Sequence, residues 1–303
     1  VACVIYYQEK LVASGIHQTY GKAHAEVLAI SNLKSEYEKN YKNEFTCFED
    51  FAAECELIVN LEPCNHYGNT PPCCLLIKES GLKKVTFATY DINPAVFKKS
   101  LLAFSDSKYE LIKPEDLSQE IQEQAKYLNR AFFSIKEKEQ KKQLPIWLTL
   151  KIASYADGGM ITKSEDEWIT SKESRKDVHR LRSINQVLIS SSATIKADQP
   201  KYNVRHSAKE LALLDTRDPD ICAIYHDNKV ELPALESSRK IIYKRLDSLD
   251  KKSLEKLIQY LSFHGYQRIM IEAGPKLSQA FIEAGLVDEL IVYQASENRS
   301  QQE

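Results

Sequence analysis

The stretch LEPCNHYGNTPPC, residues 61–73, places two cysteines nine positions apart around a turn and contains a double proline before the second one. The chain has seven cysteines, an odd and moderate number that favours metal-binding, catalytic or buried thiols over a disulfide framework. The spacing of Cys64 and Cys73 alone is a weak indication of a metal, because both could be buried thiols or an adventitious pair.

A histidine and a carboxylate strengthen the indication, because HAE at residues 24–26 opens a predicted helix that follows a predicted strand. One imidazole and two thiolates make a three-ligand zinc site, whose fourth position is left for a water with a pKa lowered to about 7. The prolines before Cys73 place it in the first turn of a helix, where the dipole favours a thiolate. Glu26 can lean past the helix end and carry protons without binding the metal. We therefore predict His24, Cys64 and Cys73 as zinc ligands and Glu26 as the catalytic proton carrier.

The order His-x-Glu, then Pro-Cys and a second Cys, is that of zinc deaminases, although here eight residues rather than two separate the cysteines. The longer pattern, HAE followed by EPCxHxGxTPPC, resembles the deaminase half of the bifunctional riboflavin-biosynthesis deaminase/reductase, the RibD family, and DINP at 91–94 fits the same family. The resemblance implies a cytidine-deaminase-like three-layer α/β/α domain acting on a phosphoribosylated diaminopyrimidine. It also implies that His17 and His66 line the pyrimidine pocket, with a surface position as the alternative for each.

Hydrophobic periodicity predicts alternating strands and helices on both sides of a charged linker, KEKEQKKQ at 136–143. We predict a deaminase domain at 1–140 and a reductase domain at 145–303. A capping box from Thr170 to Glu173 is predicted to introduce the helix at 171–184. The predicted strands are 1–7, 11–17, 57–61, 84–90, 145–153, 186–190, 221–225, 239–243, 268–274 and 288–295, and the other predicted helices are 24–39, 71–81, 254–263 and 275–285.

Four segments of the C-terminal part, 150–158, 167–182, 191–205 and 271–293, resemble the reductase half of the same family in family order. The resemblance implies a dihydrofolate-reductase-like α/β domain that uses NADPH, and the segment 191–205 resembles a loop that holds cofactor and substrate. EAGP, residues 272–275, also places a glycine and a helix start after a strand, which suits a cofactor phosphate. The alternative for Gly274 is a simple turn, and the alternative for Arg182 and Arg205 is a surface charge. The implied NADPH-binding residues are Ala153, Trp168, Thr194, Asp198 and Gly274, and the implied substrate-binding residues are Arg182, Arg205 and Glu272.

Some positions depart from the family pattern. Asn69 stands where relatives have Arg or Lys for the substrate phosphate, Tyr155 replaces a usual serine, and Asp166 replaces a serine offered to the substrate. The match begins at Val1 and ends near Tyr293, so we expect a truncated C-terminal domain with an open sheet edge that a second subunit of a homo-oligomer covers.

Charge and composition limit the other function classes. The chain of 303 residues has 41 basic and 43 acidic residues, which disfavours nucleic acid as a partner. No apolar run reaches a membrane span and the opening residues do not form a signal peptide, so we expect a cytoplasmic protein without a membrane partner. The alternatives to a two-step riboflavin enzyme are a degenerate relative with one active domain, a structural zinc or interaction protein with His66 as fourth ligand, and a nucleic-acid base deaminase.

Overall fold

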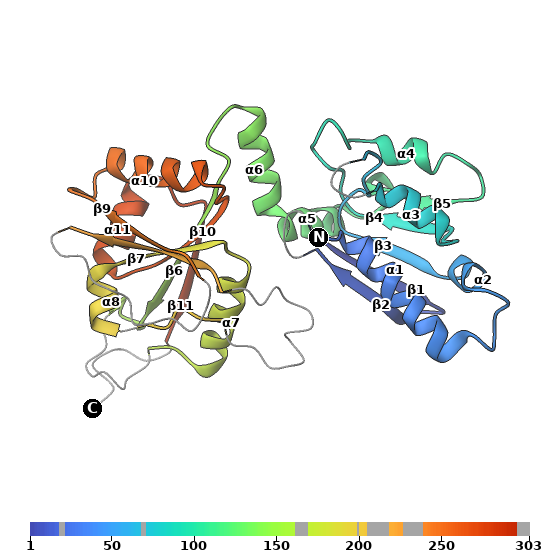
Figure 1. Cartoon of the computed structure of the whole chain (residues 1–303), viewed down its shortest axis with the longest axis horizontal. Coiled ribbons are helices and arrows are strands. Elements are labelled where there is room, and N and C mark those ends of the chain that lie inside the picture. The colour runs from blue at the N-terminus through green and yellow to red at the C-terminus, as the bar shows by residue number, and fades with distance from the viewer. Residues whose placement is uncertain are drawn as a thin grey trace. The chain divides into compact units, whose positions relative to one another are not determined.

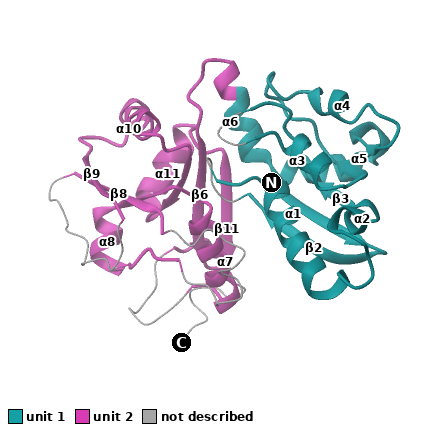
Figure 2. Cartoon of the chain, turned by 45° about the vertical axis from the view of Figure 1, so that its right-hand side comes forward, with its two compact units in different colours: residues 1–137 teal, residues 138–303 magenta. Residues whose placement is uncertain are grey.

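The computed structural model describes residues 1–17, 22–67, 71–160, 169–198, 200–204, 218–226 and 239–295. The chain divides into two compact units, Val1–Glu137 and Lys138–Glu303 (Figure 2). The division falls within the predicted linker, residues 136–143, and helix α6 (Arg130–Gln140) runs through it. Each unit has its own sheet and its own core.

The first unit contains a five-stranded sheet in the order β2-β1-β3-β4-β5 (Figure 1). The hairpin strands β1 and β2 are antiparallel, β1 is antiparallel to β3, and β3, β4 and β5 are parallel. Alternate residues of β1 and β3 point into the core. The strands are β1 (Ala2–Tyr7), β2 (Lys10–Ile16), β3 (Glu56–Val59), β4 (Lys84–Phe87) and β5 (Glu110–Ile112).

Two of this unit's helices bring site residues to the sheet. Helix α1 (Ala25–Glu36) buries a stripe of small and branched residues against β1 and β2, and α3 (Cys73–Glu79) packs beside it. A π-helix (Tyr37–Tyr41) continues α1, and its two tyrosines pack around Phe51. The remaining helices are α2 (Phe48–Ala53), α4 (Lys99–Ala103), a 3-10 turn (Pro114–Asp116), α5 (Gln119–Leu128) and α6.

Glycine at position 15 sets the distance between β2 and α1. A Cβ at Gly15 would lie 2.2 Å from the carbonyl oxygen of Ala25 and 2.5 Å from the main-chain nitrogen of Ala29. Because these are main-chain atoms, a side chain here would displace the start of α1. Gly15 therefore allows the helix that begins after His24 to lie close to the sheet.

The second unit contains a six-stranded sheet in the order β11-β6-β10-β7-β8-β9, with every pair parallel. Helices α10 and α11 contribute to the core on one face, and α7 and α8 to the core on the other. The carboxyl ends of parallel strands meet at one edge, where open α/β sheets bind ligands. The elements are β6 (Trp147–Ser154), α7 (Lys172–Ser183), β7 (Val187–Ser191), α8 (Ser192–Asp198), β8 (Asp220–Tyr225), β9 (Ile241–Arg245), α10 (Lys251–Phe263), β10 (Arg268–Glu272), α11 (Pro275–Glu283) and β11 (Glu289–Gln294).

The structure confirms the predicted strands and helices, with boundaries shifted by a few residues. The predicted capping box is wrong: the N-cap of α7 is Ser171, whose hydroxyl accepts from the main-chain N–H of Ser174, one residue later than Thr170. The segment that resembles a ligand-holding loop begins with helix α8. Within the described ranges, no helix has the length and apolarity needed to cross a membrane.

Candidate zinc and reductase sites

His24 is the N-cap residue of α1, with extended backbone angles that turn the chain into the helix. The close approach of α1 to β2 at Gly15 fixes where this turn lies. The Nδ1 atom of His24 is 3.2 Å from Sγ of Cys73 and 3.7 Å from Sγ of Cys64. The helix start therefore brings an imidazole nitrogen to both predicted sulfur ligands.

The two cysteines come from either end of the stretch at 61–73. Cys64 lies in the loop after β3, and Cys73 is the first residue of α3, preceded by Pro72 at the N-cap. The main-chain N–H of Cys73 donates to Sγ of Cys64 over 3.3 Å, and the N–H of Cys74 donates to the carbonyl of Cys64 over 3.1 Å. The start of α3 thus holds the loop so that both sulfurs face the same point.

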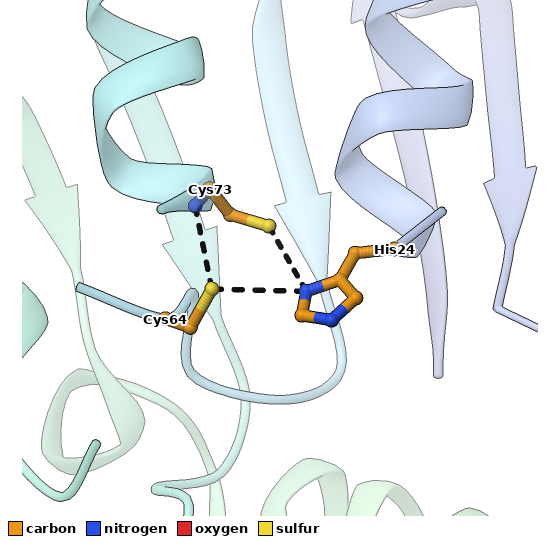
Figure 3. Close-up of side chains that lie close together, drawn as sticks. All are labelled: His24, Cys64 and Cys73. Carbon is orange, nitrogen blue, oxygen red and sulfur yellow. Dashed lines mark hydrogen bonds between the residues drawn. The ribbon is translucent and has the colours of Figure 1, made fainter. Parts of the chain in front are cut away.

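The three predicted ligands form one cluster, in which the nitrogen and the two sulfurs all lie within 4.8 Å of one another (Figure 3). A tetrahedral zinc with bonds of about 2.0–2.3 Å spaces such ligand atoms about 3.5–3.8 Å apart. The observed nitrogen–sulfur distances of 3.2 and 3.7 Å are close to this spacing. Soft thiolates with an imidazole are also a donor set that zinc prefers, so these residues fit the ion.

The electrostatics of the thiols favour a cation. Hydrogen bonds from Cys73 hold the pKa of the Cys64 thiol well below its usual value, and the neighbouring His24 lowers it further. The hydrogen bond to Cys64, together with burial, raises the pKa of Cys73. The hydrogen bond with Cys64 raises the pKa of His24, although burial opposes this. Two adjacent thiolates repel each other, so a divalent cation is needed before both ionise.

Glu26 lies in the first turn of α1 and is buried. Burial raises the pKa of its carboxyl, and a main-chain hydrogen bond and the charge of His24 offset this only in part. A buried carboxyl with a raised pKa beside a metal site is a candidate for proton transfer.

Of the two histidines predicted to line the pocket, His17 contacts the ligand His24, and His66 is close to the ligand Cys64 in sequence. The ring of His17 packs edge-on against that of His24, with centroids 5.3 Å apart, and its Nδ1 donates to the carbonyl of Ala23 over 3.0 Å. Burial lowers the pKa of His17, which favours the neutral ring. His66 follows Cys64 by two residues, and its buried Nδ1 atom has no hydrogen-bond partner among the described residues. Such an atom can bond to a ligand.

A fourth protein ligand is absent from the cluster within the described ranges. The neighbouring thiol, Cys74, instead donates to the carbonyl of Pro63 over 3.4 Å. Three ligands among the described residues leave a tetrahedral ion one position that a water molecule can take.

In the second unit, Thr194 joins the ends of β7 and β10. Its hydroxyl accepts from the main-chain N–H of Gly274 over 3.0 Å and lies 3.0 Å from the hydroxyl of Ser191. Gly274 is the N-cap of α11, with Pro275 as the first helical residue. The structure therefore brings together two of the predicted cofactor residues.

Arg182 and Glu272, both predicted to bind substrate, form a two-pronged ion pair. The guanidinium nitrogens Nε and Nη2 lie 2.6 and 2.7 Å from the two carboxylate oxygens, and Nη1 donates to the carbonyl of Asn203 over 3.2 Å. Glu272 is buried at the end of β10, and Arg182 is in the last turn of α7. Three of the five N–H groups of the guanidinium are thus used within the protein.

Of the other predicted reductase residues, Ala153 and Asp198 lie in the described part of the chain. Ala153 lies near the carboxyl end of β6, and Asp198 is the last residue of α8, where burial raises the pKa of its carboxyl and the charge of Lys151 opposes this. Trp168 and Arg205 lie outside the described residues, as do the departing positions Asn69 and Asp166. Tyr155, the remaining departure, is fully buried.

Two polar contacts near these sites were not predicted. The buried carboxylate of Glu62 accepts hydrogen bonds from residues about 30–40 positions later in the chain, and the hydroxyl of Tyr202 donates to that of Ser190 over 2.5 Å. An acidic residue directly before Pro-Cys was a visible signal for the first. The second depends on a tertiary contact that leaves no sequence pattern.

Comparison with protein families gives a match to each unit. The family described as cytidine and deoxycytidylate deaminase zinc-binding region matches residues 1–89, and the RibD C-terminal domain matches residues 146–297. The first match contains His24, Glu26, Cys64 and Cys73. Together the two matches confirm the predicted fold class, a deaminase-like α/β domain followed by a dihydrofolate-reductase-like α/β domain.

Curated relatives and solved structures extend the similarity over most of the chain. The riboflavin biosynthesis protein RibD of Bacillus amyloliquefaciens is 31% identical over 97% of this chain and 77% of its own length. That of Escherichia coli (strain K12) is 32% identical, with 97% and 80% covered. Acinetobacter baumannii RibD superposes with a TM-score of 0.66 at 27% identity, covering 97% of this chain and 79% of that one. A Thermotoga maritima diaminohydroxyphosphoribosylaminopyrimidine deaminase/5-amino-6-(5-phosphoribosylamino)uracil reductase shares the fold, with a TM-score of 0.69 at 24% identity over 99% of this chain and 81% of that one.

Proposed function

Because the chain belongs to the RibD family, we propose that it is a bifunctional riboflavin-biosynthesis enzyme that acts twice on a phosphoribosylated pyrimidine. Its first reaction is the hydrolytic deamination of diaminohydroxyphosphoribosylaminopyrimidine to 5-amino-6-(5-phosphoribosylamino)uracil. Its second is the NADPH-dependent reduction of the ribosyl group to a ribityl chain. We assign the deaminase to residues 1–140 and the reductase to 145–303. The observation that supports this best is the three-ligand cluster beside Glu26, in a chain that also contains the RibD C-terminal domain.

In the deaminase, His24, Cys64 and Cys73 hold the zinc. The bound ion supplies Lewis acidity, which lowers the pKa of a water molecule toward neutrality. Glu26 would accept a proton from the attacking water and pass a proton to the amine, which leaves as ammonia. His17, whose pKa is lowered by burial, and His66, whose Nδ1 has no hydrogen-bond partner among the described residues, would contact the pyrimidine and orient it.

In the reductase, Ala153, Trp168, Thr194, Asp198 and Gly274 bind NADPH, and Arg182, Arg205 and Glu272 lie on the substrate side. The Thr194–Gly274 hydrogen bond holds the start of α11, where main-chain N–H groups can meet a cofactor phosphate. The ion pair of Arg182 with Glu272 fixes both side chains, so a substrate phosphate has the remaining N–H groups of Arg182 available. Positioning of the hydride donor against the ribosyl carbon is the main contribution of this unit.

One set of assays tests both reactions in the intact chain. The undeaminated pyrimidine should release ammonia without NADPH, and the deaminated pyrimidine should oxidise NADPH. Glu26→Gln should reduce ammonia release by at least about 100-fold, as expected for loss of a proton-transfer group, and leave NADPH oxidation with the deaminated compound unchanged. The native protein could oxidise NADPH with the deaminated compound and yet release no ammonia from the undeaminated one. This result would contradict the proposal and identify a degenerate relative with one active domain.

We further propose that the enzyme is a cytoplasmic homo-oligomer. All seven cysteines are unpaired, which suits a reducing compartment. Strand β11 is at one edge of the second sheet, and Leu290 and Val292 on it are 51% and 50% exposed, so a second subunit would protect this edge. Light scattering of the purified protein should give a mass that is a multiple of one chain, and a monomer at micromolar concentration would contradict the proposal.

A further inference from the structure

Glu62 is a buried carboxylate two residues before the ligand Cys64. Its side chain is hydrogen-bonded to the segment 91–100, and the residue is 3% exposed. Oε2 accepts from the main-chain N–H groups of Asp91 and Lys98, over 3.3 and 3.0 Å. Oε1 accepts from the N–H and the hydroxyl of Ser100, over 3.1 and 2.7 Å.

The partners of this carboxylate are all neutral. Within the described ranges, no lysine or arginine forms an ion pair with Glu62, and the main chain and one hydroxyl supply its hydrogen bonds. A buried carboxylate is tolerated only when its oxygens are satisfied in this way. The four bonds therefore fix the path of the segment 91–100 relative to the loop at Glu62.

That segment covers the metal cluster. Val96, which is 3% exposed, packs in one apolar group with Cys64, Cys73 and the partly buried Val27. The side-chain amide of Asn65 donates to the carbonyl of Lys99 over 3.1 Å, which adds a second link between the cysteine loop and the segment. Movement of the segment would consequently free both the backbone of Cys64 and the apolar wall beside the two sulfurs.

We propose that Glu62 is a positioning residue of the zinc site, which holds Cys64 and the covering Val96 in the arrangement that binds the metal. This inference rests on the zinc site of the proposed function. The hydrogen bonds of its carboxylate go to the segment 91–100, so Glu62 acts through the main chain on both sides of the cluster. Outer residues that orient metal ligands typically change metal affinity by about 10- to 100-fold when they are replaced.

The substitution Glu62→Gln tests the inference with almost no change in volume. In either orientation, the amide NH₂ would face N–H donors, those of Asp91 and Lys98 or that of Ser100. The hydrogen bonds on that side of the side chain would therefore be lost. The matched control is Glu56→Gln on β3, because Glu56 accepts from the hydroxyl of Thr86 over 3.1 Å and an amide oxygen can still do so.

Zinc affinity of the full chain, measured by competition with a chromogenic chelator, should fall by about 10- to 100-fold in Glu62→Gln and change less than about threefold in Glu56→Gln. Deaminase activity of Glu62→Gln should return in excess zinc, whereas a carboxylate with a purely structural role would give a loss that zinc does not restore. Native affinity in Glu62→Gln, or no recovery at saturating zinc, would overturn the inference. A native protein that binds no zinc would instead refute the proposed function.

A milder variant keeps the test decisive if Glu62→Gln does not fold. Ser100→Ala removes the 2.7 Å hydroxyl bond and leaves the three main-chain donors in place. One such bond contributes enough to weaken zinc binding by about two- to tenfold. Zinc affinity unchanged in Ser100→Ala would overturn the inference.

Discussion

Replacement of Gly15 by alanine should disable the deaminase while sparing the reductase. A Cβ at this position would lie 2.2 Å from the carbonyl oxygen of Ala25 and 2.5 Å from the nitrogen of Ala29. Ordinary van der Waals contact needs about 3.4 Å, so the start of α1 must move away from β2 by about 1 Å. His24 and Glu26 would move with it.

The displacement has a cost in stability and a larger cost in catalysis. Overpacking of this kind destabilises by about 1–3 kcal/mol, which for a unit of this size lowers the melting temperature by roughly 3–10 °C. A misplacement of about 1 Å can reduce a rate about 100-fold. We therefore expect the rate of ammonia release by Gly15→Ala to fall about 100-fold.

The assay uses the intact chain, whose NADPH oxidation with the deaminated pyrimidine reports on the second unit. This activity should be unchanged in Gly15→Ala. Ser14→Ala on the same strand is the control, because neighbouring strand residues point to opposite faces and its main-chain bond from Asn32 is retained. Deaminase activity of Gly15→Ala within threefold of the native value would refute the steric argument.

Two further predictions concern the reductase unit. Arg182→Leu leaves Glu272 as an uncompensated buried carboxylate and should destabilise by about 3–5 kcal/mol at pH 7. In the native protein, burial raises the pKa of Glu272, but the charge of Arg182 outweighs burial and the pKa is lowered. The ion pair therefore stabilises the folded state above the unfolded pKa of about 4.3, and this contribution to the free energy of unfolding is lost as the pH falls through the folded pKa. In the variant burial prevails, so the destabilisation should shrink below about pH 4, and equal losses of urea stability at pH 7 and pH 4 would contradict the argument. Thr194→Val removes the acceptor of the Gly274 N–H and should raise the dissociation constant for NADPH about tenfold without changing zinc content; an unchanged constant in a fluorescence titration would argue against this contact.

Local sequence patterns were sufficient to predict most of the fold. The alternation in β1 and β2 and the proline start and glycine end of α3 are local features, so all three elements were predicted correctly. Helix α8 is only seven residues long and was not predicted, because one or two turns leave little periodicity. The cap of α7 was placed one residue early, because a T-x-x-E pattern also matches and only backbone geometry decides that Ser171 is the cap.

The zinc cluster was predictable because its residues occur in motifs with chemistry of their own. Two turns from a strand to a helix carry these motifs, and the topology of the sheet brings the turns together, so that His24, Cys64 and Cys73 lie close to one another. The ion pair of Arg182 with Glu272 joins residues 90 positions apart, and nothing in either neighbourhood indicates that the two predicted substrate residues bind each other. Glu62 was missed for the same reason, since its partners lie 29–38 positions later.

We expect two sulfurs and one imidazole to hold zinc and to leave one coordination position to solvent. Zinc K-edge X-ray absorption of the purified full chain tests it most directly. We predict one zinc per chain, with two sulfur atoms at about 2.3 Å and two nitrogen or oxygen atoms at about 2.0–2.1 Å. A third sulfur in the coordination shell, or a protein that takes up no zinc, would contradict this account.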